Sequence, residues 1–245
     1  MSYQELFKQL AATTQARINL GNSGSGLPTK PLLAFRSDHA LAKDAVYANL
    51  DAHTLQKDLL RIGLESIVVQ SQATDKETFL KRPDLGRILG ETFRNELLKN
   101  QIDNEVTIII SDGLSGPAVQ NHAVPFLNHL IPLIQNITLN NIIIAKHGRV
   151  AISDEIGELC NATLSIILIG ERPGLSSPDS MGIYLTYCPK TGNTDEKRNC
   201  ISNVRKYGLS YDEAAYKLNF LIRESLRLKL SGVSLKEGNP FNKLI

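Results

Sequence analysis

Residues 163–187, TLSIILIGERPGLSSPDSMGIYLTY, contain the stretch that decides the fold. Leu164 to Ile169 form a nearly continuous apolar run, which is typical of a strand buried on both faces of a sheet. The run ends in Gly170-Glu171-Arg172-Pro173-Gly174, a turn-forming sequence that carries a charged pair. Open α/β sheets bind their ligands at the carboxyl ends of strands, so we expect a binding site here.

Other Ile/Val-rich runs predict further buried strands, namely Ser66 to Gln70, Val106 to Ser111 and Asn141 to Lys146. Helical patterns alternate with these strands, over Leu85 to Leu98, Ala118 to Gln135 and Asp154 to Cys160. Pro125 and Pro132 predict a kink in the second helix, or two shorter helices. This alternation indicates an α/β fold in which residues 65–245 form a Rossmann-like parallel sheet flanked by helices.

A small helical N-terminal domain is predicted for residues 1–64, which show no strand pattern. A second helix in this region is expected from near Ser37-Asp38 to Leu50. At the other end of the chain, Ser210 and Glu213 form a capping box that predicts a closing helix. The first helix should pack on a partner or on the chain's own domain, through the stripe Leu6, Phe7, Leu10, Thr14 and Ile18.

Composition argues against several classes of partner. With 27 Lys plus Arg and 25 Asp plus Glu, the net charge of +2 provides no strong field for nucleic acid or an acidic membrane. The start has neither a secretion leader nor a membrane-spanning apolar stretch, so a cytoplasmic protein is expected. Cys160, Cys188 and Cys200 match neither a disulfide framework nor a CxxC metal site, and the histidines form no HExxH pair. We therefore expect free thiols and no metal site.

Glycine-bearing loops follow the last three predicted strands. They are Asp112-Gly113-Leu114-Ser115-Gly116, His147-Gly148-Arg149-Val150 and Gly170-Glu171-Arg172-Pro173-Gly174. The carboxyl ends of parallel strands lie along one edge of a sheet, so the three loops are expected to line one crevice. The alternative is that glycine and proline in these loops only turn the chain between strand and helix.

Two familiar motifs are only approximated. Gly21 to Gly26, GNSGSG, follows a helix rather than a strand and lacks the GK[ST] ending of a P-loop. Ser115 lies in GLSGP, whereas a nucleophile elbow requires GxSxG. We therefore assign no catalytic residue to this chain.

Glu171 and Cys200 each have two interpretations. Glu171 could form a surface ion pair with Arg172, or it could accept hydrogen bonds from amide groups of a bound ligand. Cys200 could be an inert core residue, or part of a donor-rich loop formed by Arg198 to Asn203, RNCISN.

Residues 147–187 read HGRVAISDEIGELCNATLSIILIGERPGLSSPDSMGIYLTY, and residues 198–210 read RNCISNVRKYGLS. These segments carry a close resemblance to the small (light) subunit of ethanolamine ammonia-lyase. The resemblance continues through residues 37–44, SDHALAKD, through residues 82–87, RPDLGR, and through residues 111–115, SDGLS. It therefore covers essentially the whole chain.

This resemblance implies a subunit of a lyase that converts ethanolamine to acetaldehyde and ammonia by radical chemistry with adenosylcobalamin. It implies a hexamer of heterodimers with large, barrel-forming subunits that hold the substrate, so this chain alone should be inactive. It also implies that cobalamin lies between the two subunits and contacts Val150, Glu171 and Cys200. No DxHxxG motif is present, which agrees with the base-on cobalamin of this family. Some members are addressed to a bacterial microcompartment, and the sequence leaves that location open.

Two other functions stay as alternatives. The crevice could belong to a stand-alone nucleotide- or phosphate-binding α/β enzyme, or the chain could be a structural partner that never touches a cofactor. Nucleotide binding by the isolated chain would favour the first, and cobalamin contacts at Glu171 would exclude the second.

Overall fold

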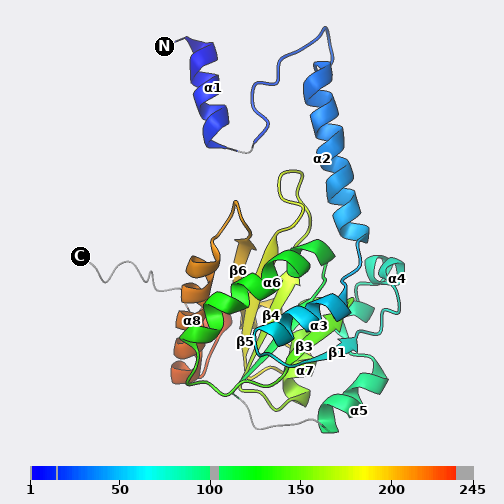
Figure 1. Cartoon of the computed structure of the whole chain (residues 1–245), viewed down its shortest axis with the longest axis vertical. Helices are drawn as coiled ribbons and strands as arrows, with labels where there is room; N and C mark the ends of the chain where they lie inside the picture. The colour runs from blue at the N-terminus through cyan, green and yellow to red at the C-terminus, as the bar shows by residue number, and fades with distance from the viewer. Residues whose placement is uncertain (1, 15, 100–104, 236–245) are drawn as a thin grey trace, which may run out of the picture.

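A mixed, six-stranded sheet with the order β1-β3-β2-β4-β5-β6 forms the centre of the molecule. The computed structural model describes residues 2–14, 16–99 and 105–235 (Figure 1). The strands are β1 (Ser66–Gln70), β2 (Val106–Ser111), β3 (Ile142–Lys146), β4 (Leu164–Gly170), β5 (Met181–Tyr187) and β6 (Arg198–Val204). Strands β1 to β4 are parallel, whereas β5 and β6 are antiparallel to their neighbours.

The expected all-parallel sheet is therefore corrected to a mixed one. The four predicted strands are confirmed to within one residue at each end, but β5 and β6 follow them as an antiparallel extension. The Arg198 to Asn203 segment, expected as a donor-rich loop, is instead strand β6 at the edge of the sheet. The strand order also differs from the 3-2-1-4-5-6 order of the dinucleotide-binding Rossmann fold.

Alternate residues of each central strand enter two separate cores. Ile108 and Ile110 of β2 face the helices α3 (Ala52–Arg61), α6 (Gly116–Leu130) and α8 (Tyr211–Leu228). Ile109 faces the opposite side, which is covered by α5 (Glu91–Lys99) and α7 (Ile152–Leu159). Because both faces are covered, these strands are apolar at most positions rather than at every second one.

The capping box before α8 is confirmed, and several helices differ from their predictions. Helix α2 (Thr29–Tyr47) begins well before Ser37, because Pro31 lies in its first turn, where proline is tolerated. The helix expected over residues 85–98 divides into a 3₁₀ turn, Leu85–Arg87, and α5, because Gly90 donates to Gln70 and extends the chain there. Helix α6 ends at Leu130, and a 3₁₀ turn, Ile131–Leu133, follows it at Pro132. Helix α4 (Lys76–Lys81) was not predicted.

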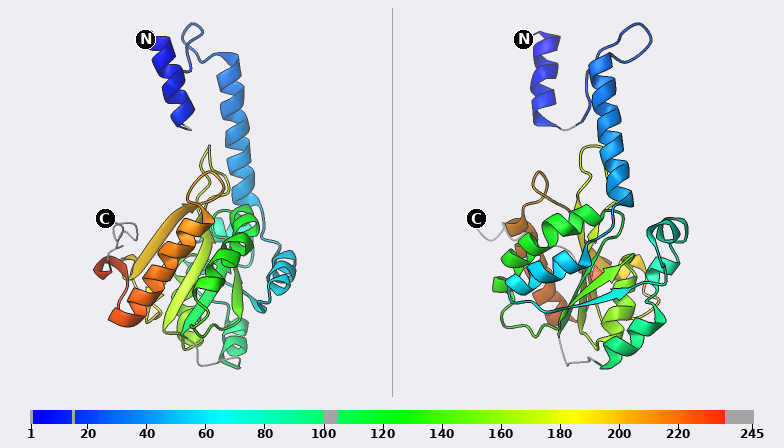
Figure 2. Two further views of the ribbon diagram at one scale, coloured as in Figure 1. Left: turned by 60° about the vertical axis from the view of Figure 1, so that its left-hand side comes forward. Right: turned by 45° about the vertical axis from the view of Figure 1, so that its right-hand side comes forward.

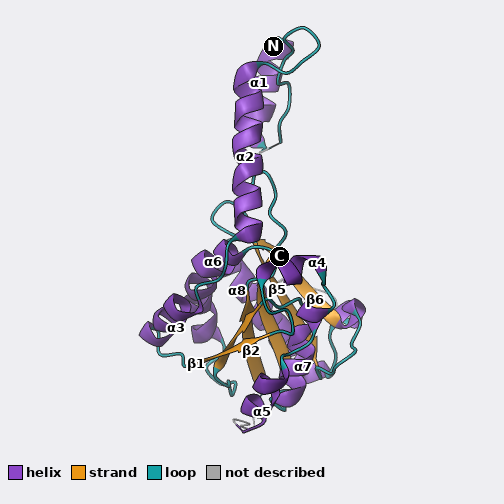
Figure 3. Ribbon diagram, turned by 90° about the vertical axis from the view of Figure 1, so that its right-hand side faces the viewer, coloured by secondary structure: helices purple, strands orange, loops and turns teal. Residues whose placement is uncertain are grey.

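The first two helices form an arm that projects from the sheet (Figures 1, 2 and 3). Helix α1 (Tyr3–Thr13) and most of α2 lie beyond the carboxyl ends of the strands, and Ala45 is the one buried residue of α2. Leu6, Phe7 and Leu10 of the predicted stripe are exposed. Helix α3, by contrast, packs on the sheet through the fully buried Leu55 and Leu59. The domain division at residue 64 stays a prediction.

Candidate functional site

The three glycine-bearing loops meet at one edge of the sheet, as predicted. The backbone N–H of His147 donates to Asp112 Oδ1 at 2.7 Å, which joins the loops after β2 and β3. The N–H of Leu114 donates to the carbonyl of Gly170 at 3.0 Å, which joins the loops after β2 and β4. Gly113 has φ +50°, and a Cβ there would lie 2.5 Å from the Gly170 carbonyl oxygen, so only glycine permits this close approach.

Asp112 is the buried centre of this edge. Lys76 from α4 donates to Asp112 Oδ2 at 3.1 Å and to the Gly113 carbonyl at 3.0 Å, and His147 Nδ1 lies 3.2 Å from the same carboxylate. Burial alone would raise the pKa of Asp112, but the hydrogen bond from His147 and the charge of Lys76 lower it below its usual value. Asp112 therefore holds two of the loops as an ionised group.

Glu171 is held in place at the end of β4. Ser180 Oγ donates to Glu171 Oε2 at 2.5 Å, and the backbone N–H of Asn203 lies 3.3 Å from the same oxygen. Gly182 of β5 leaves room for the carboxylate, since a Cβ there would lie 3.0 Å from Oε1. The alternative of an ion pair with Arg172 is wrong, because within the described residues Glu171 bonds to Ser180 and Asn203 instead.

One side chain, that of Tyr184, lies between Cys200 and the Glu171 carboxylate. Tyr184 of β5 is paired in register with Cys200 of β6, and their side chains share a hydrogen bond. Burial raises the pKa of Tyr184 above its usual value, and the adjacent Cys200 and Glu171 add to this effect. Cys200 itself is exposed, so the interpretation of an inert core residue is wrong.

Val150 and Glu171 line one cavity of about 420 Å³. Its apolar surface comes from Leu114, Ile169 and Tyr184. Cys200 borders a neighbouring cavity of about 440 Å³ instead, together with Asn203. The structure thus brings two of the three predicted residues to one cavity and places the third next to it, across Tyr184.

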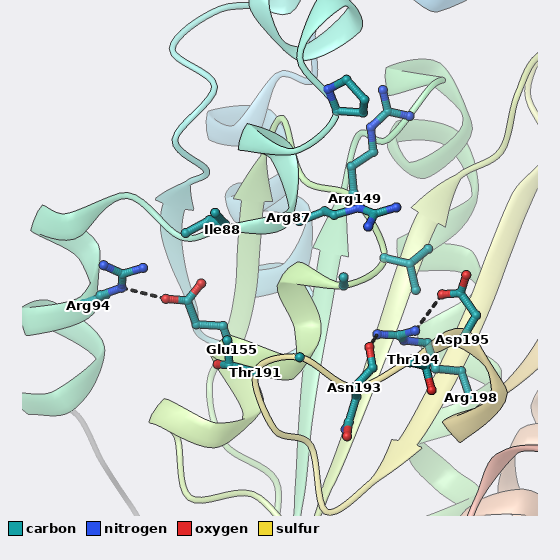
Figure 4. Close-up of a pocket in the computed structure, with 14 residues that line it drawn as sticks. Arg87, Ile88, Arg94, Arg149, Glu155, Thr191, Asn193, Thr194, Asp195 and Arg198 are labelled. Carbon is teal, nitrogen blue, oxygen red and sulfur yellow. Dashed lines mark hydrogen bonds and ion pairs between the residues drawn. The ribbon is translucent and has the colours of Figure 1, made fainter.

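A third cavity, of about 720 Å³, continues past Val150 along α7 (Figure 4). Arg94 pairs with Glu155 there at 2.6 Å, and Arg198 pairs with Asp195 at 2.6 Å and with the buried Asp154. Arg87 and Arg149 line the same cavity, and Figure 4 draws no partner for either of them.

Several residues of this edge were not predicted. Tyr184, Ser180 and Lys76 stand out in no motif, because their roles follow from strand register and from the position of α4. An alternating pattern in residues 181–187 was the one signal that could have identified β5 and thereby Tyr184.

Ser115 has a structural role at this edge. Ser115 accepts from the N–H of Ala118 and donates to the Pro178 carbonyl, so it caps α6. Across residues 2–14, 16–99 and 105–235, no His, Cys, Asp and Glu side chains gather into a metal-binding group. Within the same ranges, no helix has the length and apolar character needed to cross a membrane.

The protein is thus an α/β chain that has cavities of ligand size at one edge of its sheet and an exposed helical arm. The family model of the ethanolamine ammonia-lyase light chain matches residues 4–236. The small subunit from Azotobacter vinelandii is 48% identical over 237 residues, covering 94% of this chain and 88% of the relative. Those from Pseudomonas aeruginosa and Xanthomonas campestris are 48% and 46% identical, covering 93% and 96% of this chain and 86% and 88% of the relatives. The chain belongs to the ethanolamine ammonia-lyase small-subunit family.

Proposed function

We propose that this chain is the cobalamin-contacting subunit of an adenosylcobalamin-dependent ethanolamine ammonia-lyase, which releases acetaldehyde and ammonia by radical chemistry. The observation that carries the proposal is the shared cavity of Val150 and Glu171, with Cys200 next to it across Tyr184. In the proposed complex, cobalamin lies between this edge and the large subunit.

The residues of this edge suit a corrin ring. The ring has an apolar body and a rim of primary amides, so it requires apolar contacts and fixed acceptors. Leu114, Ile169 and Val150 supply apolar surface, and the Glu171 carboxylate supplies an acceptor that Ser180 and Asn203 hold in place. Hydrogen bonds between a carboxylate and amide N–H groups are stronger than bonds between neutral groups.

The reactive chemistry comes from the cofactor, which supplies a homolytically cleavable carbon–cobalt bond when it is bound. In the proposed division of labour, this chain binds and orients one side of the cofactor. The substrate pocket belongs to a large, barrel-forming subunit, and the assembly is a hexamer of heterodimers. We place the complex in the cytoplasm, with a bacterial microcompartment as an alternative location.

The arm supports the proposed partner. Several large apolar side chains are exposed on it, which favours a protein contact; they are Leu6, Phe7, Leu10, Leu33, Phe35, Leu41 and Tyr47. The arm and the loop between β4 and β5 lie at the same end of the molecule (Figures 1 and 2). One large subunit could therefore cover both the arm and the cofactor edge.

Reconstitution tests this function. We expect the purified chain with adenosylcobalamin to release no ammonia from ethanolamine, and we expect activity once the large subunit is added. Ammonia release by this chain and cofactor alone would place the substrate pocket here and contradict the proposal. Binding of a nucleotide by the isolated chain, without cobalamin binding by the complex, would favour the alternative α/β enzyme.

A further inference from the structure

Arg149 is a half-buried cation with few partners. Its guanidinium lies 4.2 Å from the centre of the Phe79 ring, and Nη2 donates to the Phe79 carbonyl at 3.2 Å. Nε is buried and has no hydrogen-bond partner among the residues that the structure describes. Burial, and then the charges of Arg87 and Arg172, lower the pKa of Arg149, so its positive charge is poorly stabilised in the structure as it stands.

Arg87 and Arg172 share this lack of a counter-ion. Both are exposed, and in the part of the chain that the structure describes neither forms an ion pair with a carboxylate. The other two arginines of the large cavity differ, since Arg94 pairs with Glu155 and Arg198 with Asp154 and Asp195. Within the described residues, Arg87 and Arg149 thus place charge without a counter-ion in the large cavity, and Arg172 places it in the adjoining cavity of Glu171.

Backbone groups add to this positive end. Helix α7 begins at Ile152, directly after Arg149-Val150-Ala151, and has no side-chain cap. The N–H groups of Val150 and Ala151 have no acceptor among the described residues. The turn before α7 carries these two free N–H groups, whereas the first N–H groups of the helix itself donate to the carbonyls of residues 149–151. The turn lies beside the guanidinium groups of Arg87 and Arg149, which have no carboxylate partner among the described residues, so this end of the cavity favours an anion.

We propose that Arg87, Arg149 and Arg172 bind a phosphodiester, namely that of the nucleotide loop of cobalamin. This inference rests on the proposed function. The cavity that contains Arg87 adjoins the cavity of Glu171, and Arg149 and Val150 line both, so one ligand can occupy the two. Cobalamin has neutral amides around its corrin ring and one phosphodiester in its nucleotide loop. The Glu171 cavity matches the amides, and the arginines match the phosphodiester through charge-assisted hydrogen bonds.

Cobinamide provides the test, because it has the corrin ring and its amides but lacks the nucleotide loop and its phosphodiester. The variants are Arg87→Gln and Arg172→Gln, whose exposed side chains form no ion pair or side-chain hydrogen bond with the other described residues. Arg82→Gln is the matched control, since Arg82 is exposed on the same loop as Arg87 and pairs with Asp84. The dissociation constants of cyanocobalamin and dicyanocobinamide are measured by titration of the assembled large–small complex, together with the Kd of subunit assembly without cofactor.

We expect each variant to weaken cyanocobalamin binding about tenfold, as the loss of one charge-assisted hydrogen bond predicts, and to leave cobinamide binding and assembly unchanged. Arg82→Gln should change none of the three. Equal losses for both ligands, or no loss for either, would overturn the proposal. Weaker assembly without cofactor would show that the arginines pair with carboxylates of the large subunit instead. Failure of the wild-type complex to bind any cobalamin would refute the proposed function itself.

Discussion

Leucines of the arm and leucines of helix α6 have opposite environments. Leu33 and Leu41 of α2 are 58% and 54% exposed, whereas Leu127 and Leu130 of α6 are fully buried against the sheet. The described contacts that hold the arm together are few, and the main one is Arg17, which pairs with Asp38 at 2.5 Å and lies over the Phe35 ring. The sheet region therefore contains its own core, and the arm has an apolar surface that its own chain leaves uncovered.

The two regions therefore contribute to two different free energies, that of folding and that of assembly. Burial of α6 contributes to folding, because its leucines leave water when the chain folds. The apolar side chains of α2 leave water only if another molecule covers them. Substitutions in the two regions should therefore change different measurements, folding in one region and assembly in the other.

The largest expected effect is that of Asp112→Ala in the sheet region. Removing this carboxylate leaves the buried Lys76 without its counter-ion, which costs about 3 to 5 kcal/mol of the free energy of unfolding. Chemical denaturation measures this loss. Asp84→Ala is the control, since Asp84 forms an exposed pair with Arg82, and its melting temperature should stay at the wild-type value. If Asp112→Ala were as stable as Asp84→Ala, Asp112 would contribute no more to the free energy of unfolding than an exposed residue, which would contradict its role at the centre of this edge.

The same carboxylate predicts a pH dependence. The folded state lowers the pKa of Asp112, so the unfolded state binds a proton at a higher pH than the folded state does. The contribution of Asp112 to stability is then complete above the unfolded value of about 3.9, and it decreases as the pH falls below that value. The stability difference between wild type and Asp112→Ala should shrink in this acidic range.

The next effect compares the two leucine environments directly. Leu127→Ala should lower the free energy of unfolding by about 2 to 5 kcal/mol, because it opens a cavity between α6 and the sheet. Leu41→Ala should leave the unfolding of the isolated chain unchanged and should weaken assembly with the large subunit about tenfold. Thermal melts and an assembly titration measure the two quantities. Unchanged assembly would contradict the proposed contact between the arm and the large subunit.

Smaller effects are expected at the proposed cofactor site, which is the sheet edge between the two regions. Glu171→Ala should weaken cobalamin binding by the assembled complex roughly 10- to 100-fold, since about 1.5 to 3 kcal/mol of charge-assisted bonding is lost. Glu171→Gln keeps the shape and should cost about 1 kcal/mol, or roughly fivefold. A cobalamin titration gives these values.

Glu105→Ala is the control for this pair, because Glu105 accepts from Thr138 at the opposite end of the sheet. Its cobalamin affinity should equal that of the wild type. An unchanged affinity in Glu171→Ala would remove Glu171 from the site. A large loss of thermal stability with unchanged affinity would assign Glu171 a structural role through Ser180 and Asn203.

The parallel strands could be predicted because their burial is symmetric. Strands β2 and β4 are covered on both faces, so most of their residues are apolar and the runs stand out in the sequence. Strand β6 lies at an edge and exposes Cys200, Ser202 and Asn203, and these polar residues gave the segment the composition of a loop. A strand with one exposed face and one free edge gives a weaker signal.

The meeting of the loops was also predictable, whereas the groups that hold them together were not. Parallel strands bring Gly113, His147 and Gly170 to one edge by topology alone. The contacts of Lys76 with Asp112 and of Asn203 with Glu171 span 36 and 32 residues of sequence. They depend on where α4 and β6 pack, which no local pattern encodes.

The smallest effect concerns Cys160, which lies at the end of α7 in the second core. Burial raises the pKa of this thiol to about 11, so the folded state keeps its proton at a pH where the unfolded state loses it. Stability from this group is complete below the unfolded value of about 9 and decreases as the pH rises toward 11, by about 1 kcal/mol at pH 10. Cys160→Ala should lack this part of the alkaline loss, which denaturation at pH 8 and pH 10 measures.

Thiol labelling checks the same assignment at neutral pH. Cys188 and Cys200 are exposed and should react in the folded chain, whereas Cys160 should react only after unfolding. Rapid labelling of Cys160 in the folded chain would mean that the core around α7 opens readily. The stability of the sheet region would then come mainly from the face covered by α3, α6 and α8, and the contrast with the arm would apply to that face alone.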